Sequence, residues 1–270
     1  MSQETQGNKR SDTTRYIAFA NQKGGVGKTT SAVTLAHGLA RLGRRTLLVD
    51  LDPQGHVAFA LGQEKGGGVY GLICEDRPLA KVVQPARPNL DILPGNKQTE
   101  LVKRHILTNN THPSLLLEKL QDRGYEYVMF DLAPSMDVLH VYGLVASDWV
   151  IIPTRLDALA VDGVKEILLT MGEVGRRGYT FRGYSIVPTF FDRTTRETLT
   201  QFKLLVRTFT RHVWPPIPQD TRAREAAAYG KTLYEYAPSS QAIRGYPGGH
   251  DRLGGYQKML ERLLEALDDR

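Results

Sequence analysis

One stretch decides the fold of this 270-residue chain: Lys23-Gly24-Gly25-Val26-Gly27-Lys28-Thr29-Thr30. A short apolar run at residues 16–20 precedes it, and a helical pattern over residues 30–42 follows and stops at Gly43. Glycines let backbone N–H groups turn toward one point, and the start of a helix adds partial positive charge. The stretch therefore predicts an anion cradle between a strand and a helix.

The two polar residues after the glycines indicate which anion is bound. Lys28 can reach the β- and γ-phosphates of a nucleotide, and the Thr29 hydroxyl can ligate Mg²⁺. The strict phosphate-loop pattern has glycine at position 22, where this chain has Gln22, followed by an additional Lys23. A glycine-rich turn that binds nothing is the alternative, but the flanking strand and helix favour a nucleotide site.

Apolar runs along the chain predict the rest of the architecture. Residues 46–49, 127–130, 149–152 and 184–187 are continuous apolar or small stretches, and helical patterns separate most of them. Strands of this kind alternating with helices predict an α/β fold, with one doubly wound, mostly parallel sheet covered by helices on both faces. We expect a flexible tail at residues 1–14 and a single P-loop ATPase domain over residues 15–270.

The composition excludes several classes of protein. Hydrophobic residues make up 41% and charged residues 24%, which is typical of a globular protein. One cysteine excludes an internal disulfide framework and favours a reducing, cytoplasmic location. No apolar run approaches the length of about 20 residues that spans a membrane. Histidines show no zinc-binding spacing.

Three aspartates follow predicted strands, at the edge where doubly wound sheets bind ligands. Asp50 and Asp52 end the run at 46–49, and Asp131 ends the run at 127–130. Residues at i and i+2 of an extended segment point the same way, so Asp50 and Asp52 share one side. Two carboxylates beside a triphosphate are costly unless Mg²⁺ or water lies between them, which predicts a metal-assisted site.

Together these segments resemble the ParA/MinD family of ATPases, closest to the Soj-like ParA branch. The stretch 23–30 is similar to the family's deviant Walker A motif, Val49-Asp50-Leu51-Asp52-Pro53-Gln54-Gly55 to its second motif, and Phe130-Asp131-Leu132-Ala133-Pro134-Ser135 to its Walker B segment. Residues 217–231 resemble the late segment of the ParA branch. The resemblance covers residues 16–246. It departs at Ala133, where the family usually has proline, and the stretch 244–256 is longer than usual.

The resemblance implies a role for each residue of the nucleotide site. All of residues 23–30 would bind ATP, and Asp52 would orient the attacking water. Asp50 and Asp52 would also belong to the Mg²⁺ site, where Asp50 supports the shell of the metal. Asp131 would hold Mg²⁺ through water, together with Thr29. Lys23 would reach across a dimer interface to the partner's nucleotide. The adenine contacts it implies are Pro188, Thr189, Pro218 and Asp220. Lys23, Lys28 and Asp52 are thus the catalytic candidates for an ATPase that is weak alone and stimulated by a partner and DNA.

Positive charge is concentrated in residues 176–224. This segment contains ten basic and three acidic residues, whereas the net charge of the whole chain is only +6. Within this segment residues 197–211 predict an amphipathic helix. Its basic residues recur at helical spacing as one stripe: Arg196, Lys203, Arg207 and Arg211. Such a stripe can bind DNA phosphates without reading bases, although an ordinary solvated surface is the alternative. Arg222 and Arg224 lie where the Soj-like branch places a DNA-contacting arginine.

The resemblance and the basic stripe lead to one hypothesis with alternatives. ATP would drive a homodimer that binds double-stranded DNA non-specifically on the nucleoid, and a ParB-like adaptor would stimulate hydrolysis, so that a plasmid or chromosome is partitioned. A protein cargo could use the same ATPase. A MinD-like membrane-associated ATPase is the other alternative, but the end of the chain has an acidic tip. An iron protein on this scaffold would need two cysteines, and a scaffold that does not hydrolyse ATP would follow if Ala133 disables the switch.

Overall fold

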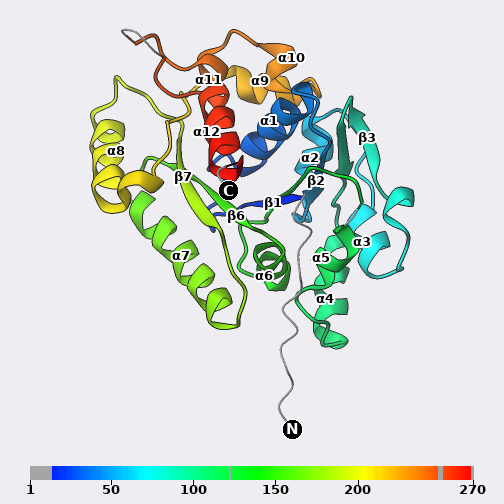
Figure 1. The fold of residues 1–270 in the computed structure, drawn as a ribbon. Helices are drawn as coiled ribbons and strands as arrows, with labels where there is room; N and C mark the ends of the chain where they lie inside the picture. Colours follow the sequence, from blue (N-terminus) through cyan, green and yellow to red (C-terminus); the bar gives the residue numbers. More distant parts are fainter. Residues whose placement is uncertain (1–13, 122, 249–251, 269–270) are drawn as a thin grey trace.

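The computed structural model describes residues 14–121, 123–248 and 252–268. Seven strands form one sheet in the order β3-β4-β2-β5-β1-β6-β7 (Figure 1). The strands are β1 Arg15–Phe19, β2 Thr46–Asp50, β3 Gln84–Arg87, β4 Leu90–Leu93, β5 Tyr127–Asp131, β6 Trp149–Arg155 and β7 Gly183–Thr189. All neighbouring pairs are parallel except β3 with β4, which confirms the predicted mostly parallel sheet.

The five strands expected from apolar runs are β1, β2, β5, β6 and β7, and these include the central strands of the sheet. The sequence reasoning missed β3 and β4, a hairpin at one edge. Each has only four residues, and β3 contains Pro85, which lacks the N–H of a regular strand residue. Asn89 turns the hairpin with a φ of 61°. These short edge strands lack the continuous apolar pattern on which the prediction depended.

Helices cover both faces of the sheet, as Figure 1 shows. They are α1 Lys28–Arg41, α2 His56–Ala60, α3 Gly68–Ile73, α4 Thr99–Thr108, α5 Leu115–Leu120, α6 Val138–Val145, α7 Ala160–Arg176, α8 Arg196–Phe209, α9 Arg222–Ala228, α10 Leu233–Tyr236, α11 Gln241–Arg244 and α12 Tyr256–Asp268, with the 3₁₀ turns η1 Leu79–Lys81 and η2 Thr210–His212. One core cluster joins the sheet to α3–α8, and a second joins it to α1, α2 and α9–α12. Each face thus buries its own apolar layer.

The ends of the chain attach to this body differently. Residues 1–13 of the expected tail lie outside the described residues, but Thr14 is buried and its hydroxyl donates to the Tyr125 carbonyl at 2.9 Å. At the other end, Tyr256, Met259 and Leu263 of α12 are at most 2% exposed. Tyr256 also contacts α1, with 3.0 Å between its hydroxyl oxygen and that of Ser31. No helix in the described ranges is long and apolar enough to cross a bilayer.

Candidate nucleotide-binding site

The glycine-rich loop links β1 to α1. It thus lies between a buried strand and a largely buried helix, as the sequence predicts. Gly25 has a φ of 70° and Gly27 a φ of 88°, left-handed values that strain other residues. No atom lies within 4 Å of the position that a Cβ would take on Gly24 or Gly25, so the backbone there faces open space. The loop therefore presents its N–H groups beside the N-terminus of a 14-residue helix, where an anion binds favourably.

Lys28 is the first residue of α1 and is 7% exposed. Its ammonium Nζ donates to the Lys23 carbonyl at 3.0 Å, so the side chain folds back along the loop. Burial lowers the pKa of Lys28, and the Asp131 and Asp52 carboxylates oppose that effect. Burial disfavours the charged form of Lys28 unless an anion lies close to it. A phosphate placed in the loop would be such an anion.

Asp131 and Asp50 end neighbouring strands and are opposite each other in the parallel register of β2 and β5. The Thr29 hydroxyl donates to Asp131 Oδ2 at 2.6 Å, whereas Asp131 Oδ1 is buried without a hydrogen-bond partner among the described residues. Burial raises the pKa of Asp131 to about 7, although the Thr29 and Lys28 side chains lower it. A buried, unpartnered carboxylate oxygen beside a threonine hydroxyl suits a hydrated Mg²⁺.

Asp50 ends β2, as the sequence predicts, and it also supports the backbone that follows the strand. It is fully buried, and burial followed by the Asp131 carboxylate raises its pKa well above the usual value. Its two carboxylate oxygens accept backbone N–H groups, from Asp52 at 3.1 Å and from Val57 at 3.0 Å. Asp50 thus holds the turn that carries Asp52 and the start of α2. The described residues contain no group of three His, Cys, Asp or Glu side chains arranged for a metal, so Mg²⁺ here would need phosphate ligands.

The turn after β2 is fixed against a second loop that sequence reasoning did not identify. Asp52 Oδ1 accepts the Gln54 N–H at 2.9 Å. A Cβ on Gly95, which follows β4, would lie 2.5 Å from the Asp50 carbonyl oxygen and 2.9 Å from that of Asp52. A Cβ on Gly55 would in turn lie 2.5 Å from the Gly95 carbonyl oxygen. Such close backbone approach requires glycine, and it sets where the Asp52 carboxylate lies.

Lys23 is held within its own chain. Its ammonium lies 3.2 Å from Asp157 Oδ1, in the loop between β6 and α7, and both side chains are partly exposed. The Lys23 N–H donates to Asn21 Oδ1 at 3.0 Å, and the Asn21 amide donates to the Pro153 carbonyl at 2.8 Å. Asp157 lies 134 residues from Lys23, and no local sequence signal points to it.

The segments expected to contact adenine come together at the end of β7. The Thr189 hydroxyl donates to the Val26 carbonyl at 2.9 Å, which joins β7 to the phosphate loop. The Ile217 N–H donates to the Pro188 carbonyl at 2.7 Å, so the segment containing Pro218 lies alongside. The Asp220 carboxylate accepts the Arg222 N–H at 3.1 Å, just before α9. These contacts join Thr189 to the phosphate loop and bring the segment that follows Ile217 next to the end of β7.

The six basic residues expected to bind DNA are all exposed, but they do not form one group. Arg196, Lys203 and Arg207 lie on α8, and Arg211 lies on η2, because the helix ends two residues earlier than predicted, at Phe209. Arg222 and Arg224 lie on α9, which Figure 1 places at the top of the molecule, whereas α8 forms its left flank. Val206, an apolar residue of α8, is also 40% exposed.

A phosphate loop at the carboxyl edge of a parallel sheet, with a buried Thr–Asp pair behind it, defines a P-loop nucleotide-binding protein. Comparison with known proteins identifies the family. Residues 14–180 match the family described as "AAA domain". The chromosome-partitioning ATPase Soj of Thermus thermophilus is 37% identical over 94% of this chain and 97% of its own length. The chain therefore belongs to the AAA-domain family and, within it, to the Soj/ParA chromosome-partitioning ATPases.

A second Soj protein agrees with this assignment, and a solved structure shares the fold. The sporulation initiation inhibitor protein Soj of Bacillus subtilis is 31% identical over 86% of this chain and 95% of its own. The solved structure of cobyrinic acid a,c-diamide synthase from Mycobacterium smegmatis, with a bound ATP analogue and magnesium, has a TM-score of 0.70. It is 30% identical and matches 84% of this chain and 96% of its own. The family resemblance stated from the motifs is thus confirmed.

Proposed function

We propose that this chain is an ATP-dependent DNA-binding switch that partitions a plasmid or chromosome. ATP and Mg²⁺ bind at the carboxyl edge of the sheet, two copies then associate, and the dimer binds duplex DNA without regard to sequence. Hydrolysis, stimulated by DNA and a ParB-like adaptor, reverses these steps. The observation that carries the proposal is the unpartnered Asp131 Oδ1 beside Thr29 and Lys28, because this arrangement lacks only a metal-bound triphosphate.

The residues of the edge divide the chemistry among them. Lys28 and the backbone of the loop bind and orient the phosphates, and Thr29 with Asp131 would hold Mg²⁺. The metal would supply charge that neutralises the phosphate oxygens. Asp52, whose backbone Gly95 and Asp50 fix in place, accepts a hydrogen bond from the water and orients it. Lys23, once released from Asp157, would provide a cation to the nucleotide of the partner copy.

Exposed apolar side chains at the same edge support the association of two copies. Met136 follows β5, Leu159 follows β6 and Phe190 follows β7, and they are 37%, 58% and 36% exposed. All three follow strands at the carboxyl edge of the sheet, and Phe190 lies against Gly27 of the phosphate loop, so burial against a second copy would be favourable there. Phe190 adopts a φ of 52°, and the Arg155 guanidinium lies 5.4 Å from its ring centre. A nucleotide in the loop would therefore become part of the interface.

The stripe on α8 supplies the DNA contacts in this proposal. An α-helix rises about 1.5 Å per residue, so the part of the stripe that lies on α8, from Arg196 to Arg207, extends over about 16 Å, and Arg211 follows on η2. That length covers several phosphates of one duplex strand. Two copies would place two weak stripes on one duplex and raise the overall affinity.

The MinD-like alternative needs an apolar helix face that can enter a lipid surface. The apolar face of α12 is not available for this, since Met259, Leu260 and Leu263 are at most 7% exposed and belong to the core cluster that includes α1. The described geometry therefore favours DNA over a membrane as the surface to which the ATP-bound form attaches.

The test is binding to random-sequence duplex DNA without nucleotide, with ADP, and with ATP–Mg²⁺, at two salt concentrations. We expect binding with ATP–Mg²⁺ alone, and we expect it to weaken steeply with salt because counterions are released. Absence of ATP-dependent binding at low salt would overturn the DNA part of the proposal. Turnover measured in parallel, with and without DNA, distinguishes a hydrolysing switch from an ATP-dependent scaffold.

A further inference from the structure

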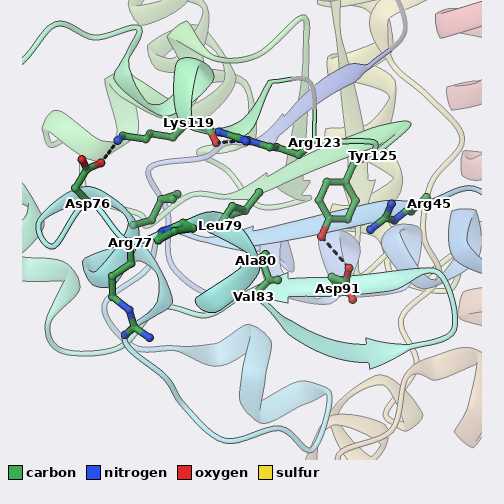
Figure 2. Close-up of a pocket in the computed structure, with 12 residues that line it drawn as sticks. Arg45, Asp76, Arg77, Leu79, Ala80, Val83, Asp91, Lys119, Arg123 and Tyr125 are labelled. Carbon is green, nitrogen blue, oxygen red and sulfur yellow. Dashed lines mark hydrogen bonds and ion pairs between the residues drawn. The ribbon is translucent and has the colours of Figure 1, made fainter.

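A second cavity lies at the opposite, amino edge of the sheet, away from the phosphate loop. It has a volume of about 490 Å³, within the range of small-molecule sites. Arg45 directly precedes β2 and Tyr125 lies just before β5, and α5, η1 and the end of α3 supply the other walls. Figure 2 shows Lys119 and Arg123 along one side, Leu79, Ala80 and Val83 in the middle, and Arg45 beside Tyr125 at the far end.

The floor of this cavity is apolar, and its rim is basic. Leu72, Leu79 and Tyr125 are buried, with exposures of 1%, 6% and 6%. Four basic side chains line the cavity: Arg45, Arg77, Lys119 and Arg123. Among the described residues, two acidic side chains line it with them, Asp76 and Asp91. A cationic rim above an apolar floor suits a molecule that has both an anionic group and a ring or other apolar part.

Both lining carboxylates are already bound to other partners. Asp76 forms an ion pair with Lys119, and the Tyr125 hydroxyl donates to Asp91 Oδ2 at 2.8 Å. Burial, followed by the hydrogen bond to Asp91, raises the pKa of Tyr125, so this hydroxyl remains a donor at neutral pH. Asp76 is therefore paired with Lys119, and one oxygen of Asp91 is bound by Tyr125.

Arg45 and Arg123 have no carboxylate partner among the described residues. The Arg45 guanidinium lies 4.9 Å from the centre of the Tyr125 ring, which orients it, and the nearby Glu126 pairs with Arg44 instead. Arg123 donates to the Lys119 carbonyl at 3.5 Å, and no other side-chain hydrogen bond of Arg123 is formed within the part of the chain that the structure describes. Arg77 differs, because it pairs with Glu75 at 3.7 Å and extends away from the others in Figure 2. Two guanidinium groups with free donors thus face one cavity.

We propose that this cavity binds a phosphorylated small molecule of about mononucleotide size. Arg123, beside Lys119 on one side of the cavity, binds its phosphate, Arg45 at the far end binds acceptor atoms of its ring, and the floor formed by Leu72, Leu79 and Val83 packs against that ring. Guanidinium groups bind phosphate through paired hydrogen bonds, which favours phosphate over a neutral ligand. This site is independent of the ATP switch, since it lies at the other edge of the sheet and shares no residue with the phosphate loop.

The experiment measures AMP binding by calorimetry to the full chain carrying Lys28→Ala, which disables the phosphate loop, so that failure of the ATP switch does not affect the result. We expect saturable binding that Arg45→Gln and Arg123→Gln each weaken about tenfold, the cost of one charged hydrogen bond. Arg104→Gln, an exposed arginine on α4, is the matched control and should leave the affinity unchanged.

Two further measurements keep the test decisive. Adenosine, which lacks the phosphate, should bind at least about tenfold more weakly than AMP. Thermal unfolding checks that each variant is folded, and Arg123→Gln remains informative if loss of the Arg45–Tyr125 contact destabilises the chain. Absence of AMP binding, equal binding of adenosine, or equal effects of Arg123→Gln and Arg104→Gln would overturn the proposal.

Discussion

The nucleotide-binding site at the carboxyl edge of the sheet and the basic stripe on α8 both carry many charges, but the surroundings of these charges differ. At the edge, Lys28, Asp50 and Asp131 are at most 7% exposed, and the pKa of each is shifted by burial. On α8 only Thr198 and Leu205 are buried, and the basic side chains extend into solvent. Buried charges are costly unless a partner compensates them, so the edge is specific for one ligand. Exposed charges cost little and accept any polyanion.

The largest effect should come from removing the cation of the edge. Lys28→Ala deletes the ammonium that reaches the phosphates, and we expect ATP affinity to fall at least about 100-fold, near 3 kcal/mol. Fluorescent-nucleotide titration measures this change. Lys165→Ala, an exposed lysine on α7, is the control and should bind ATP normally. Normal ATP binding by Lys28→Ala would contradict the view that the buried charges of the nucleotide site are specific for their ligand.

Asp52→Ala should separate turnover from binding. The Asp52 carboxylate lies beside the site without filling it, so we expect ATP to bind with nearly wild-type affinity. We expect the hydrolysis rate to fall by about 100-fold or more, since the water loses the group that orients it. Single-turnover hydrolysis and nucleotide titration on one preparation measure both quantities. Equal loss of binding in Asp52→Ala and Lys28→Ala would contradict the roles assigned to these residues.

Gly95→Ala tests whether the close backbone packing around Asp50 and Asp52 is required for stability and for hydrolysis. A Cβ there would overlap the Asp50 and Asp52 carbonyl oxygens, and we expect the free energy of unfolding to fall by about 1–3 kcal/mol. Hydrolysis should decline as well, because the Asp52 turn must move. Gly175→Ala is the matched control: no atom lies within 4 Å of its would-be Cβ in α7, and alanine should stabilise that helix by about 0.5–1 kcal/mol. Equal denaturation midpoints for the two variants would contradict this explanation.

The sequence was sufficient wherever the signal was local. The loop 23–30 places backbone, cation and hydroxyl within eight residues, and the apolar runs of the central strands need no partner to be recognised. The structure confirms the sheet and brings Thr29 and Asp131 within hydrogen-bonding distance, although 102 residues separate them. Here two short motifs each adjoin a predicted strand, and parallel strands bring their carboxyl ends to one edge.

The sequence was insufficient where a contact depends on packing alone. Lys23 with Asp157 and Gly95 with the Asp52 turn join residues that no motif connects. The end of α8 was placed too late because Thr210 has a φ of 47°, a left-handed value that no proline or glycine signals. The cavity around Arg45 and Tyr125 is formed by segments far apart in the sequence, and none of them has a recognisable pattern.

The smallest effect should come from removing one charge of the stripe. The informative result is how DNA affinity changes with salt and with DNA sequence, rather than the size of the loss. If the exposed cations act independently, Arg207→Gln removes one phosphate contact per copy, or two per dimer. The slope of log affinity for DNA against log salt should then become shallower by about 2, equally for every DNA sequence. Binding of ATP should not change, because α8 does not contribute to the phosphate loop. Arg104→Gln is the control for net charge and should leave the slope as it is. A loss from Arg207→Gln that depended on DNA sequence would mean that α8 reads bases, and the contrast between a selective edge and an adaptable stripe would no longer hold.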